Sequence, residues 1–320
     1  MKIGYIGSGR ISKFHLPAIR NNNLTIKGIG TRKNSINCKT FAKDSDLLEY
    51  YCKGGWNEVL DKNLDAYCIC VDTDVTADIL LKVLDKGKPI LVEKPVAWNL
   101  LEIDSLCKHK NSNNIFVAYN RRFYDVVKQA KDFCDKSDSG TVNINIPDSK
   151  QGRKVFLSNG CHMIDLARYL LGDFEVLNKV IRYDSISGEI ASLTALCSNK
   201  KWSISINAHS LIPSNFGITI NSKKNVFELL PVEKFNLYEG LEIIEPDSNN
   251  PLRRYVPKII KTGYEISKFK PGFDNMYKDF REFIRSDCKP SKKNNTIFEA
   301  RNTLLKCIEL IEDNQNKLIR

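Results

Sequence analysis

The sequence lacks any long apolar run. No stretch of its 320 residues approaches the ~18–20 consecutive apolar positions that a membrane span requires. Residues 1–10 enter a predicted strand at once, without the apolar core or the small-residue cleavage site of a signal peptide. We therefore expect a cytoplasmic protein that has no membrane partner.

Paired cysteines and metal-binding spacings are also missing. The ten cysteines include no C-x-x-C pair, and none of the four histidines has ligand spacing to a cysteine pair. A chain of this length buries enough apolar surface to fold without disulfides or a structural metal. The sequence therefore predicts reduced, buried thiols and no metal site.

Charge of one sign is not gathered into a block. The chain has 49 Lys and Arg against 38 Asp and Glu, a net charge of +11, and its lysines are spread along its length. Because nucleic-acid-binding proteins usually cluster such residues, we expect no nucleic-acid partner. A lysine-rich background explains the excess. The alternative is a site for an anion, such as a phosphorylated cofactor or a nucleotide-linked sugar.

Short apolar runs alternate with helical patterns over residues 1–121. Five such runs predict strands, at residues 3–6, 25–29, 66–71, 89–92 and 115–118. Strands separated by helices predict βαβ units and an α/β fold of the Rossmann type, with a doubly wound parallel sheet. The runs are almost continuously apolar, which is typical of a sheet covered on both faces.

The pattern changes after residue 121. Consecutive alternating segments between residues 141 and 230 predict a large, mostly antiparallel sheet. The polar stretch 239–262 is interpreted as a long loop, and two helices finish the chain. The sequence thus predicts a Rossmann domain at residues 1–121 and an α+β domain at residues 122–320.

The first predicted strand runs into a glycine-rich turn. Gly7, Gly9, Arg10 and Ile11 precede a helical pattern, and Ser12 stands where the motif G-x-G-x-x-G has its third glycine. Two glycines let the backbone turn tightly and approach a pyrophosphate, which the N–H groups of the following helix bind. The position between a strand and a helix favours dinucleotide binding over a simple tight turn.

The second predicted strand ends in cations rather than in an acid. A site for NAD(H) usually has Asp or Glu here to bind the ribose 2′-hydroxyl, but this chain has Thr31, Arg32 and Lys33, and its next acid is Asp44. One hydroxyl and two cations suit a 2′-phosphate. We predict that NADP(H) is preferred and that NAD(H) is possible. The alternative is a solvated basic turn.

Three further motifs stand near predicted element ends. Glu93-Lys94-Pro95 follows the strand at 89–92, and Pro95 keeps Lys94 out of the helical region at the edge of the sheet where ligands bind. Asn120-Arg121-Arg122 lies at the predicted domain junction. A helix that begins near residue 160 contains His162 and, three positions later on the same face, Asp165.

These motifs resemble those of the Gfo/Idh/MocA family, named for glucose–fructose oxidoreductase and inositol dehydrogenase. The resemblance includes His15 and the closing pattern Gly272-Phe273-Asp274, and it covers nearly the whole chain. It implies an NAD(P)-dependent oxidoreductase that transfers a hydride between the nicotinamide and a hydroxyl or keto carbon of a sugar, nucleotide-linked sugar or cyclitol. It also implies a second domain that binds substrate and forms a dimer or tetramer.

The resemblance implies roles for single residues. Lys94 orients the substrate and takes part in proton transfer, and His162 is the general acid or base, which suits the usual histidine pKa near ~6.5. Asp165 orients the imidazole or bonds a substrate hydroxyl. Four residues complete the predicted cofactor site beyond the glycine turn and the basic turn: Glu93, Lys94, Asn120 and Arg122.

The sequence departs from the family pattern at three positions. Asp72 replaces a proline and Thr76 a histidine in the loop after the third predicted strand, and Ser158 replaces an aspartate four residues before His162. We interpret Ser158 or Asn159 as a helix cap. These departures leave two alternatives open. One is a non-catalytic cofactor-binding sensor or regulator, and the other is an NAD-retaining glycoside hydrolase on the same fold.

Overall fold

The computed structural model describes residues 1–288 and 295–312. The chain packs into two compact units. The first unit comprises Met1–Phe123 and Ser267–Lys306, and the second comprises Tyr124–Ile266 and the residues from Cys307 onward. The segment Ser267–Lys306, near the end of the chain, thus packs with the first unit. A division of functional domains after residue 121 stays a prediction.

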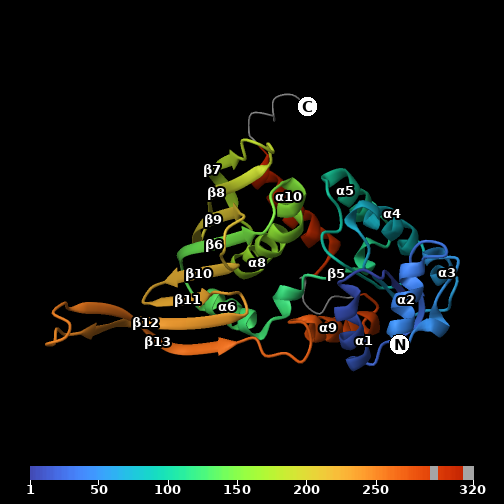
Figure 1. The fold of residues 1–320 in the computed structure, drawn as a ribbon, viewed down its shortest axis with the longest axis horizontal. Helices are drawn as coiled ribbons and strands as arrows, with labels where there is room; N and C mark the ends of the chain where they lie inside the picture. The colour runs from blue at the N-terminus through green and yellow to red at the C-terminus, as the bar shows by residue number, and fades with distance from the viewer. Residues whose placement is uncertain (289–294, 313–320) are drawn as a thin grey trace. The chain divides into compact units, whose positions relative to one another are not determined.

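The first unit contains a parallel sheet of five strands (Figure 1). The strands are β1 (Lys2–Ile6), β2 (Thr25–Gly30), β3 (Ala66–Ile69), β4 (Ile90–Val92) and β5 (Ile115–Val117). Their order is β2-β1-β3-β4-β5, and every neighbouring pair is parallel. Nearly all of their residues are buried, because helices cover both faces. The predicted Rossmann sheet is confirmed.

Helices connect these strands and follow the last of them. They are α1 (Ser12–Asn21), α2 (Ile36–Asp44), η1 (Leu48–Tyr50), α3 (Trp56–Leu60), α4 (Thr73–Leu84), α5 (Leu100–Lys108), η2 (Ser112–Asn114) and η3 (Asn120–Phe123). Two of them begin with a side-chain cap. Ser35 accepts a hydrogen bond from the backbone N–H of Cys38, and Asn99 accepts one from that of Glu102.

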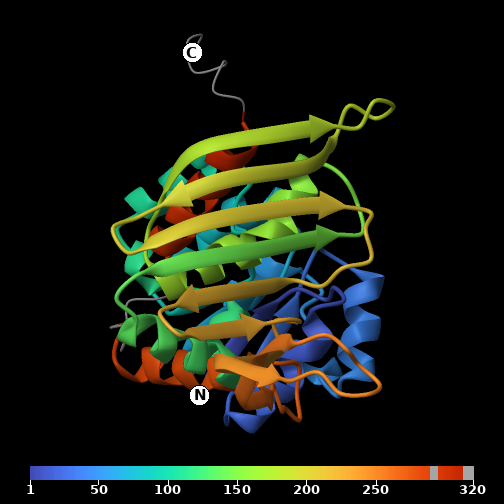
Figure 2. The same ribbon diagram turned by 90° about the vertical axis from the view of Figure 1, so that its left-hand side faces the viewer.

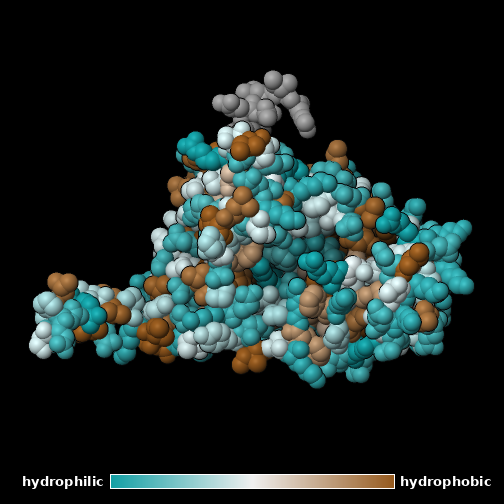
Figure 3. Space-filling model, in the orientation of Figure 1, coloured by the Kyte–Doolittle hydropathy of each residue, from teal (hydrophilic) through white to brown (hydrophobic). Residues whose placement is uncertain are grey.

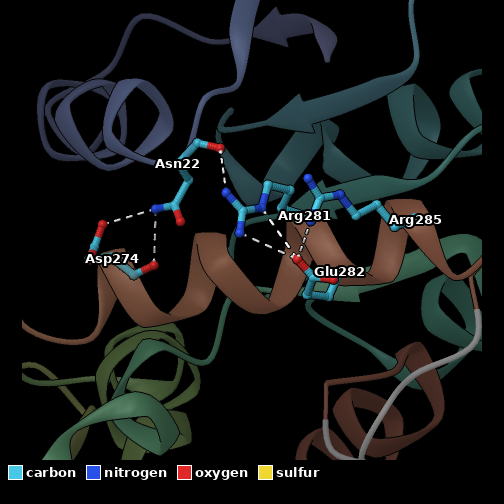
Figure 4. Close-up of polar contacts among 5 residues, drawn as sticks. All are labelled: Asn22, Asp274, Arg281, Glu282 and Arg285. Carbon is cyan, nitrogen blue, oxygen red and sulfur yellow. Dashed lines mark hydrogen bonds and ion pairs between the residues drawn. The ribbon is translucent and has the colours of Figure 1, made fainter.

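Helix α9 (Phe273–Arg285) belongs to the same unit although it lies far along the sequence. Its buried face, including Phe273, Tyr277 and Phe280, packs in one apolar cluster with residues of β1 and β3. Polar contacts join α9 to the end of α1: the Asn22 amide donates to the side chain and the backbone carbonyl of Asp274, at 2.9 and 3.2 Å (Figure 4). Helix α9 therefore packs on the Rossmann sheet, although its place in the sequence does not indicate this.

The second unit contains an eight-stranded sheet (Figure 2). Its strands are β6 (Gly140–Asp148), β7 (Glu175–Tyr183), β8 (Ile190–Ser198), β9 (Trp202–Ser210), β10 (Gly217–Ser222), β11 (Asn225–Leu229), β12 (Lys234–Ile244) and β13 (Arg254–Tyr264). The order is β13-β12-β11-β10-β6-β9-β8-β7, with β6 and β9 parallel and the other neighbours antiparallel. This confirms the predicted, mostly antiparallel sheet.

Helices cover one face of this sheet. These are α6 (Asp125–Lys136), α7 (Arg153–Val155), the π-helical turn η4 (Phe156–Gly160) and α8 (Cys161–Leu171). Strand β9 shows why one face is covered: Trp202, Ile204 and Ile206 are buried, whereas the alternating Ser203 and Ser205 are not. Helix α10 (Ile297–Ile311) begins in the first unit and ends in the second. The predicted last helix extends further, to residues outside the described ones.

The prediction of a long loop at residues 239–262 is wrong. This stretch forms most of a hairpin of β12 and β13, which projects from the rest of its sheet (Figure 1). Nearly every residue of β13 is exposed, so the stretch has no alternation of apolar and polar positions to reveal a strand. Backbone pairing, rather than burial of one face, makes this hairpin.

Two properties expected from composition can be stated for the described residues. No helix in residues 1–288 or 295–312 is long enough and apolar enough to cross a membrane. None of the ten cysteines, all of which lie in these ranges, is joined in a disulfide, and eight of them are buried. The thiols are thus mostly small core side chains.

Candidate dinucleotide and catalytic site

The glycine turn lies where the first three strands of the parallel sheet end. The N–H of Gly7 donates to the carbonyl of Gly30 at 3.2 Å, and β1 ends beside β2 with Ile6 opposite Gly30. Gly7 has a φ of +149°, and a Cβ on it would lie 2.3 Å from the carbonyl oxygen of Cys70. Only glycine fits here, because the turn crosses directly over the end of β3.

Gly9 has the opposite environment. A Cβ placed on Gly9 would meet nothing within 4 Å. The packing of the protein therefore does not require a glycine at this position. A ligand that lies against the turn would require one, because a Cβ would occupy the space that the ligand needs. The N–H of Ser12 donates to the carbonyl of Gly9 at 3.0 Å as α1 begins, and the first turn of α1 contains no acidic residue. The turn and the helix N-terminus therefore fit a dinucleotide pyrophosphate.

Ser12 itself points inward. Its side chain is fully buried, as is that of Tyr5. Replacing the third glycine of the motif by serine therefore leaves the open side of the turn unchanged. Arg10 and Ile11 lie between Gly9 and α1, and both are at least partly exposed.

The basic turn after β2 is next to the glycine turn. Thr31, Arg32 and Lys33 follow Gly30 directly, and Arg32 and Lys33 are exposed. Burial raises the pKa of the Cys38 thiol, and side-chain hydrogen bonds from Thr31 and Ser8 oppose this rise. Cys38, on α2, therefore lies close to both turns. The structure thus brings the predicted pyrophosphate and ribose-binding residues to one edge.

Lys94 stands at the end of β4. The N–H of Glu93 donates to the carbonyl of Ile69 at 2.9 Å, which continues the pairing of β4 with β3. The hydroxyl of Thr73, at the start of α4, donates to the carbonyl of Pro95 at 3.2 Å. Lys94 is half-buried. The structure therefore places it at the carboxyl ends of the parallel strands, beside the loop that follows β3.

A buried polar network lies under Lys94, and sequence reasoning did not detect it. The fully buried ring of His15 contacts two side chains: its Nδ1 is 2.7 Å from Tyr277 Oη, and its Nε2 is 2.9 Å from Glu93 Oε1. The other carboxylate oxygen of Glu93 accepts a hydrogen bond from the backbone N–H of Lys94 at 3.1 Å. The family resemblance includes His15, but its partners come from α9 and from the residue after β4.

The network holds a charged pair. Burial by itself lowers the pKa of His15, but the hydrogen bonds and charges of Cys70 and Glu93 outweigh burial and raise this pKa to about 10. Burial likewise raises the pKa of Glu93, but His15 and Lys94 outweigh it and hold that pKa below its usual value. At neutral pH the pair is therefore imidazolium and carboxylate.

The predicted junction residues lie on η3. Asn120 is buried and its amide donates to the carbonyl of Pro271 at 3.0 Å, while the buried Arg122 guanidinium lies 5.5 Å from the centre of the Tyr119 ring. Arg122 therefore has a structural contact of its own. Its neighbour Arg121 is half-buried.

Lys270, next to Pro271, is a further cation that sequence reasoning missed. Its Nζ lies 4.7 Å from the ring centre of Phe14 and 5.8 Å from that of Phe273. Burial lowers the pKa of Lys270; Glu93 opposes this, and the positive charges of Lys94 and Arg121 add to it. No sequence signal marked it, because its neighbours are brought together only by folding.

His162 and Asp165 lie in the second unit, on α8. The π-helical turn η4 leads directly into α8, and such turns are frequent at functional sites. His162 is half-buried, whereas Asp165 is 1% exposed and lies near Arg168 and Cys307. The predicted capping role of Ser158 or Asn159 is wrong: Gly160 is the N-cap of α8, and the Asn159 amide donates to Asp148 at 2.8 Å.

The two acids that follow β3, Asp72 and Asp74, lie in different environments. Asp74 accepts a hydrogen bond from the indole N–H of Trp98 at 2.6 Å, and Asp72 is exposed. The hydroxyl of Thr76 donates to the carbonyl of Asp72 at 3.0 Å and is buried within α4. At the position where the family pattern has histidine, this chain thus has a residue that stabilises its own helix.

All the predicted cofactor-binding residues therefore belong to the first unit, and so does Lys94. His162 and Asp165 belong to the second. The first unit can hold an anionic dinucleotide at the strand ends beside a half-buried lysine. The second unit presents a half-buried histidine, His162.

Comparison with known proteins agrees with this geometry. Residues 1–120 match the family described as "Oxidoreductase family, NAD-binding Rossmann fold". The chain is 30% identical to the uncharacterized oxidoreductase YrbE of Bacillus subtilis over 183 residues, which is 53% of each protein. It is 23% identical to the myo-inositol 2-dehydrogenase of Thermotoga maritima over 186 residues, 54% of this chain and 55% of that one. The chain thus matches about half the length of these curated relatives.

A solved structure extends the likeness of fold to nearly the whole chain. The levoglucosan dehydrogenase in complex with NADH and levoglucosan superposes with a TM-score of 0.73 at 15% identity, covering 99% of this chain and 97% of that one. Residues 1–120 thus match the model of the Gfo/Idh/MocA oxidoreductase family, which bears out the resemblance inferred from the motifs for that part of the chain.

Proposed function

We propose that this protein is an NAD(P)-dependent dehydrogenase or reductase that acts on CH–OH groups of a sugar-like substrate. The observation that carries the proposal is the pair of glycines at the strand ends. Gly7 lets the turn cross β3, and Gly9 leaves open space beside the N-terminus of α1. Lys94 stands at the end of a neighbouring strand of the same sheet.

The residues that hold the cofactor lie at one edge of the parallel sheet. Gly7, Gly9, Arg10 and Ile11 bind the pyrophosphate, and Thr31, Arg32 and Lys33 bind the adenosine ribose. A set of one hydroxyl and two exposed cations at this position supports a preference for NADP(H), with NAD(H) as the second choice. Glu93, Lys94, Asn120 and Arg122 complete the site. The bound cofactor supplies the acceptor or donor of the hydride.

The protein's own residues manage the proton and the substrate. In oxidation, His162 acts as a general base and accepts the proton of the substrate hydroxyl. In reduction, His162 acts as a general acid and donates a proton to the keto oxygen. Lys94 donates hydrogen bonds to the reacting oxygen and takes part in proton transfer, and Asp165 orients the imidazole through α8. Because His162 is half-buried, it can exchange that proton with solvent between turnovers.

The substrate proposed is a sugar, a nucleotide-linked sugar or a cyclitol. The named activities of similar proteins support this class: inositol for one relative and levoglucosan for one structure of the same fold. Lys270 interacts with two further cations, Lys94 and Arg121, and with the acid Glu93, which is already paired with His15. This excess of positive charge favours a substrate that carries a negative group, as a nucleotide-linked sugar does.

The first test is a fluorescence titration of the purified protein with NADPH and with NADH. Tighter binding of NADPH supports the phosphate site at Arg32, and tighter binding of NADH overturns that preference but keeps the dehydrogenase. Myo-inositol, levoglucosan and UDP-glucose are then screened for reduction of the oxidised dinucleotides NADP⁺ and NAD⁺. The Lys94→Ala variant should lose turnover while its dinucleotide affinity stays within a few-fold.

Other outcomes select the two alternative functions. Binding of a dinucleotide without turnover of any hydroxyl compound indicates a cofactor-binding sensor or regulator. Release of a sugar from a glycoside without net reduction of the dinucleotide indicates an NAD-retaining hydrolase. If neither dinucleotide binds, the proposed function fails.

The proposal includes self-association into a dimer or tetramer in the cytoplasm. Apolar side chains are exposed on the projecting hairpin, among them Leu241, Tyr255 and Ile259 (Figure 3). Exposed apolar surface of this kind is typical of a protein interface. Analytical ultracentrifugation at micromolar concentration tests this: a monomer at all concentrations would contradict it.

A further inference from the structure

In the buried network near Lys94, the negative charge of Glu93 is neutralised by His15. Glu93 precedes Lys94, and one of its oxygens accepts the backbone N–H of Lys94 at 3.1 Å. An unpaired carboxylate in this place would attract the ammonium group and favour its charged form. The other carboxylate oxygen, however, lies 2.9 Å from Nε2 of the fully buried His15.

We propose that His15 is a positioning residue for Lys94. As an imidazolium it neutralises Glu93, so that Lys94 keeps the freedom to gain and lose a proton, and it fixes the backbone that carries Lys94. The proposal that Lys94 transfers a proton rests on the function proposed above. The charge effect of His15 on Lys94 does not, because it follows from the contacts of the first unit alone.

The contacts of His15 support the imidazolium. Tyr277 Oη is 2.7 Å from Nδ1 and donates in turn to the thiol of Cys68 at 3.7 Å. A hydroxyl that donates to Cys68 accepts from His15, so Nδ1 carries a hydrogen. Nε2 faces a carboxylate and carries one as well. Both ring nitrogens are therefore donors, which is the protonated form.

Among the described residues, the other side chains that contact the ring carry no positive charge. From β1 the ring meets Tyr5, and from the residue after β3 it meets the thiol of Cys70. From α9 it meets Tyr277 and Phe273. None of these groups carries a positive charge, and burial raises the pKa of the Cys70 thiol and of both phenols.

Among the described residues, the charges of Glu93, which is negative, and of Lys270, which is positive, interact with the charge of Lys94. With His15 protonated, the negative charge of Glu93 is cancelled and the positive charge of Lys270 remains. Without His15, one uncompensated carboxylate lies next to the ammonium group. The substitution His15→Gln makes this change and keeps a side chain that can donate to Glu93.

Competitive labelling of lysines measures the effect without substrate or cofactor. The whole chain is treated with trace acetic anhydride at a series of pH values, and acetylation of Lys94 is quantified by mass spectrometry. In His15→Gln, the pH at which Lys94 is half-maximally acetylated should rise by about one unit. At a fixed pH below this midpoint, acetylation of Lys94 should therefore be roughly tenfold lower than in the unchanged protein. The midpoint of Lys13, which is exposed on α1, should not move and serves as the internal reference.

Two further variants separate charge from structure. Tyr277→Phe removes the other partner of His15 but leaves its pair with Glu93, so the midpoint of Lys94 should stay in place. His15→Gln combined with Glu93→Gln removes the uncompensated carboxylate, so the midpoint should return toward that of the unchanged protein. An equal midpoint in the unchanged protein and in a folded His15→Gln variant would overturn the proposal.

A measurement on the unchanged protein keeps the proposal testable if His15→Gln does not fold. The chain has only four histidines, so ¹⁵N spectra of the ring nitrogens are simple to assign. One ring should remain doubly protonated at pH 8, where ordinary histidines are neutral. If every ring is neutral at pH 8, His15 does not neutralise Glu93 and the proposal fails. Failure of dinucleotide binding would instead refute the proposed function and leave this result standing.

Discussion

Substituting alanine at the two glycines of the first turn should separate folding from cofactor binding. At Gly7 the new Cβ would lie 2.3 Å from the carbonyl oxygen of Cys70, and the backbone has a φ of +149°. The Cβ is about 1 Å closer than an ordinary contact, and the atom it meets is backbone, which cannot rotate away. We expect Gly7→Ala to lower the free energy of unfolding by about 2–4 kcal/mol.

Gly9→Ala is the matched control, because its Cβ meets nothing within 4 Å. We expect its free energy of unfolding to stay within about 0.5 kcal/mol of the unchanged value. Its Cβ does enter the space where a pyrophosphate would approach the turn. The affinity for the dinucleotide should therefore fall at least about tenfold, which corresponds to ~1.4 kcal/mol.

The assays are urea denaturation followed by circular dichroism and a fluorescence titration with NADPH and NADH. A Gly9→Ala protein that binds both dinucleotides as tightly as the unchanged protein would show that the turn does not hold a pyrophosphate. A Gly7→Ala protein of unchanged stability would show that the turn does not cross β3 as closely as the contact with Cys70 implies.

The remaining predictions test the ribose site, the returning helix and the buried pair. Arg32→Ala should weaken NADPH binding much more than NADH binding, whereas the same change at Lys39, exposed on α2, should affect neither; equal losses would rule out a 2′-phosphate site. Phe280→Ala should cost about 3–5 kcal/mol in urea denaturation because the side chain is fully buried, and a loss below 1 kcal/mol would contradict the packing of α9 on the sheet. Because the pKa of His15 is raised from 6.5 to about 10, its contribution to stability is complete below pH 6.5 and is lost as the pH rises toward 10. The free energy of unfolding should therefore fall between pH 7 and 10 in the unchanged protein and less so in His15→Gln. Parallel curves would show that His15 is not charged.

The sequence by itself determined the elements whose signal is local. The strands of the parallel sheet were found because each is a short apolar run between helical patterns. The glycine turn, Lys94 and η3 were placed correctly because each directly follows one of those runs. Parallel strands all end at the same edge of the sheet, so knowing the strands was enough to collect the predicted cofactor residues.

Only the tertiary structure decided the features that depend on distant partners or on pairing without burial. The hairpin of β12 and β13 was missed because nearly all of β13 and the second half of β12 are exposed, so these segments show no alternation of buried and exposed positions. The contact between His15 and Tyr277 joins residues 262 positions apart, and no pattern within either helix indicates it. The same holds for Lys270, whose neighbours meet only when α9 returns to the first unit. Local periodicity reports which face of an element is buried, but only the folded chain shows which side chain it is buried against.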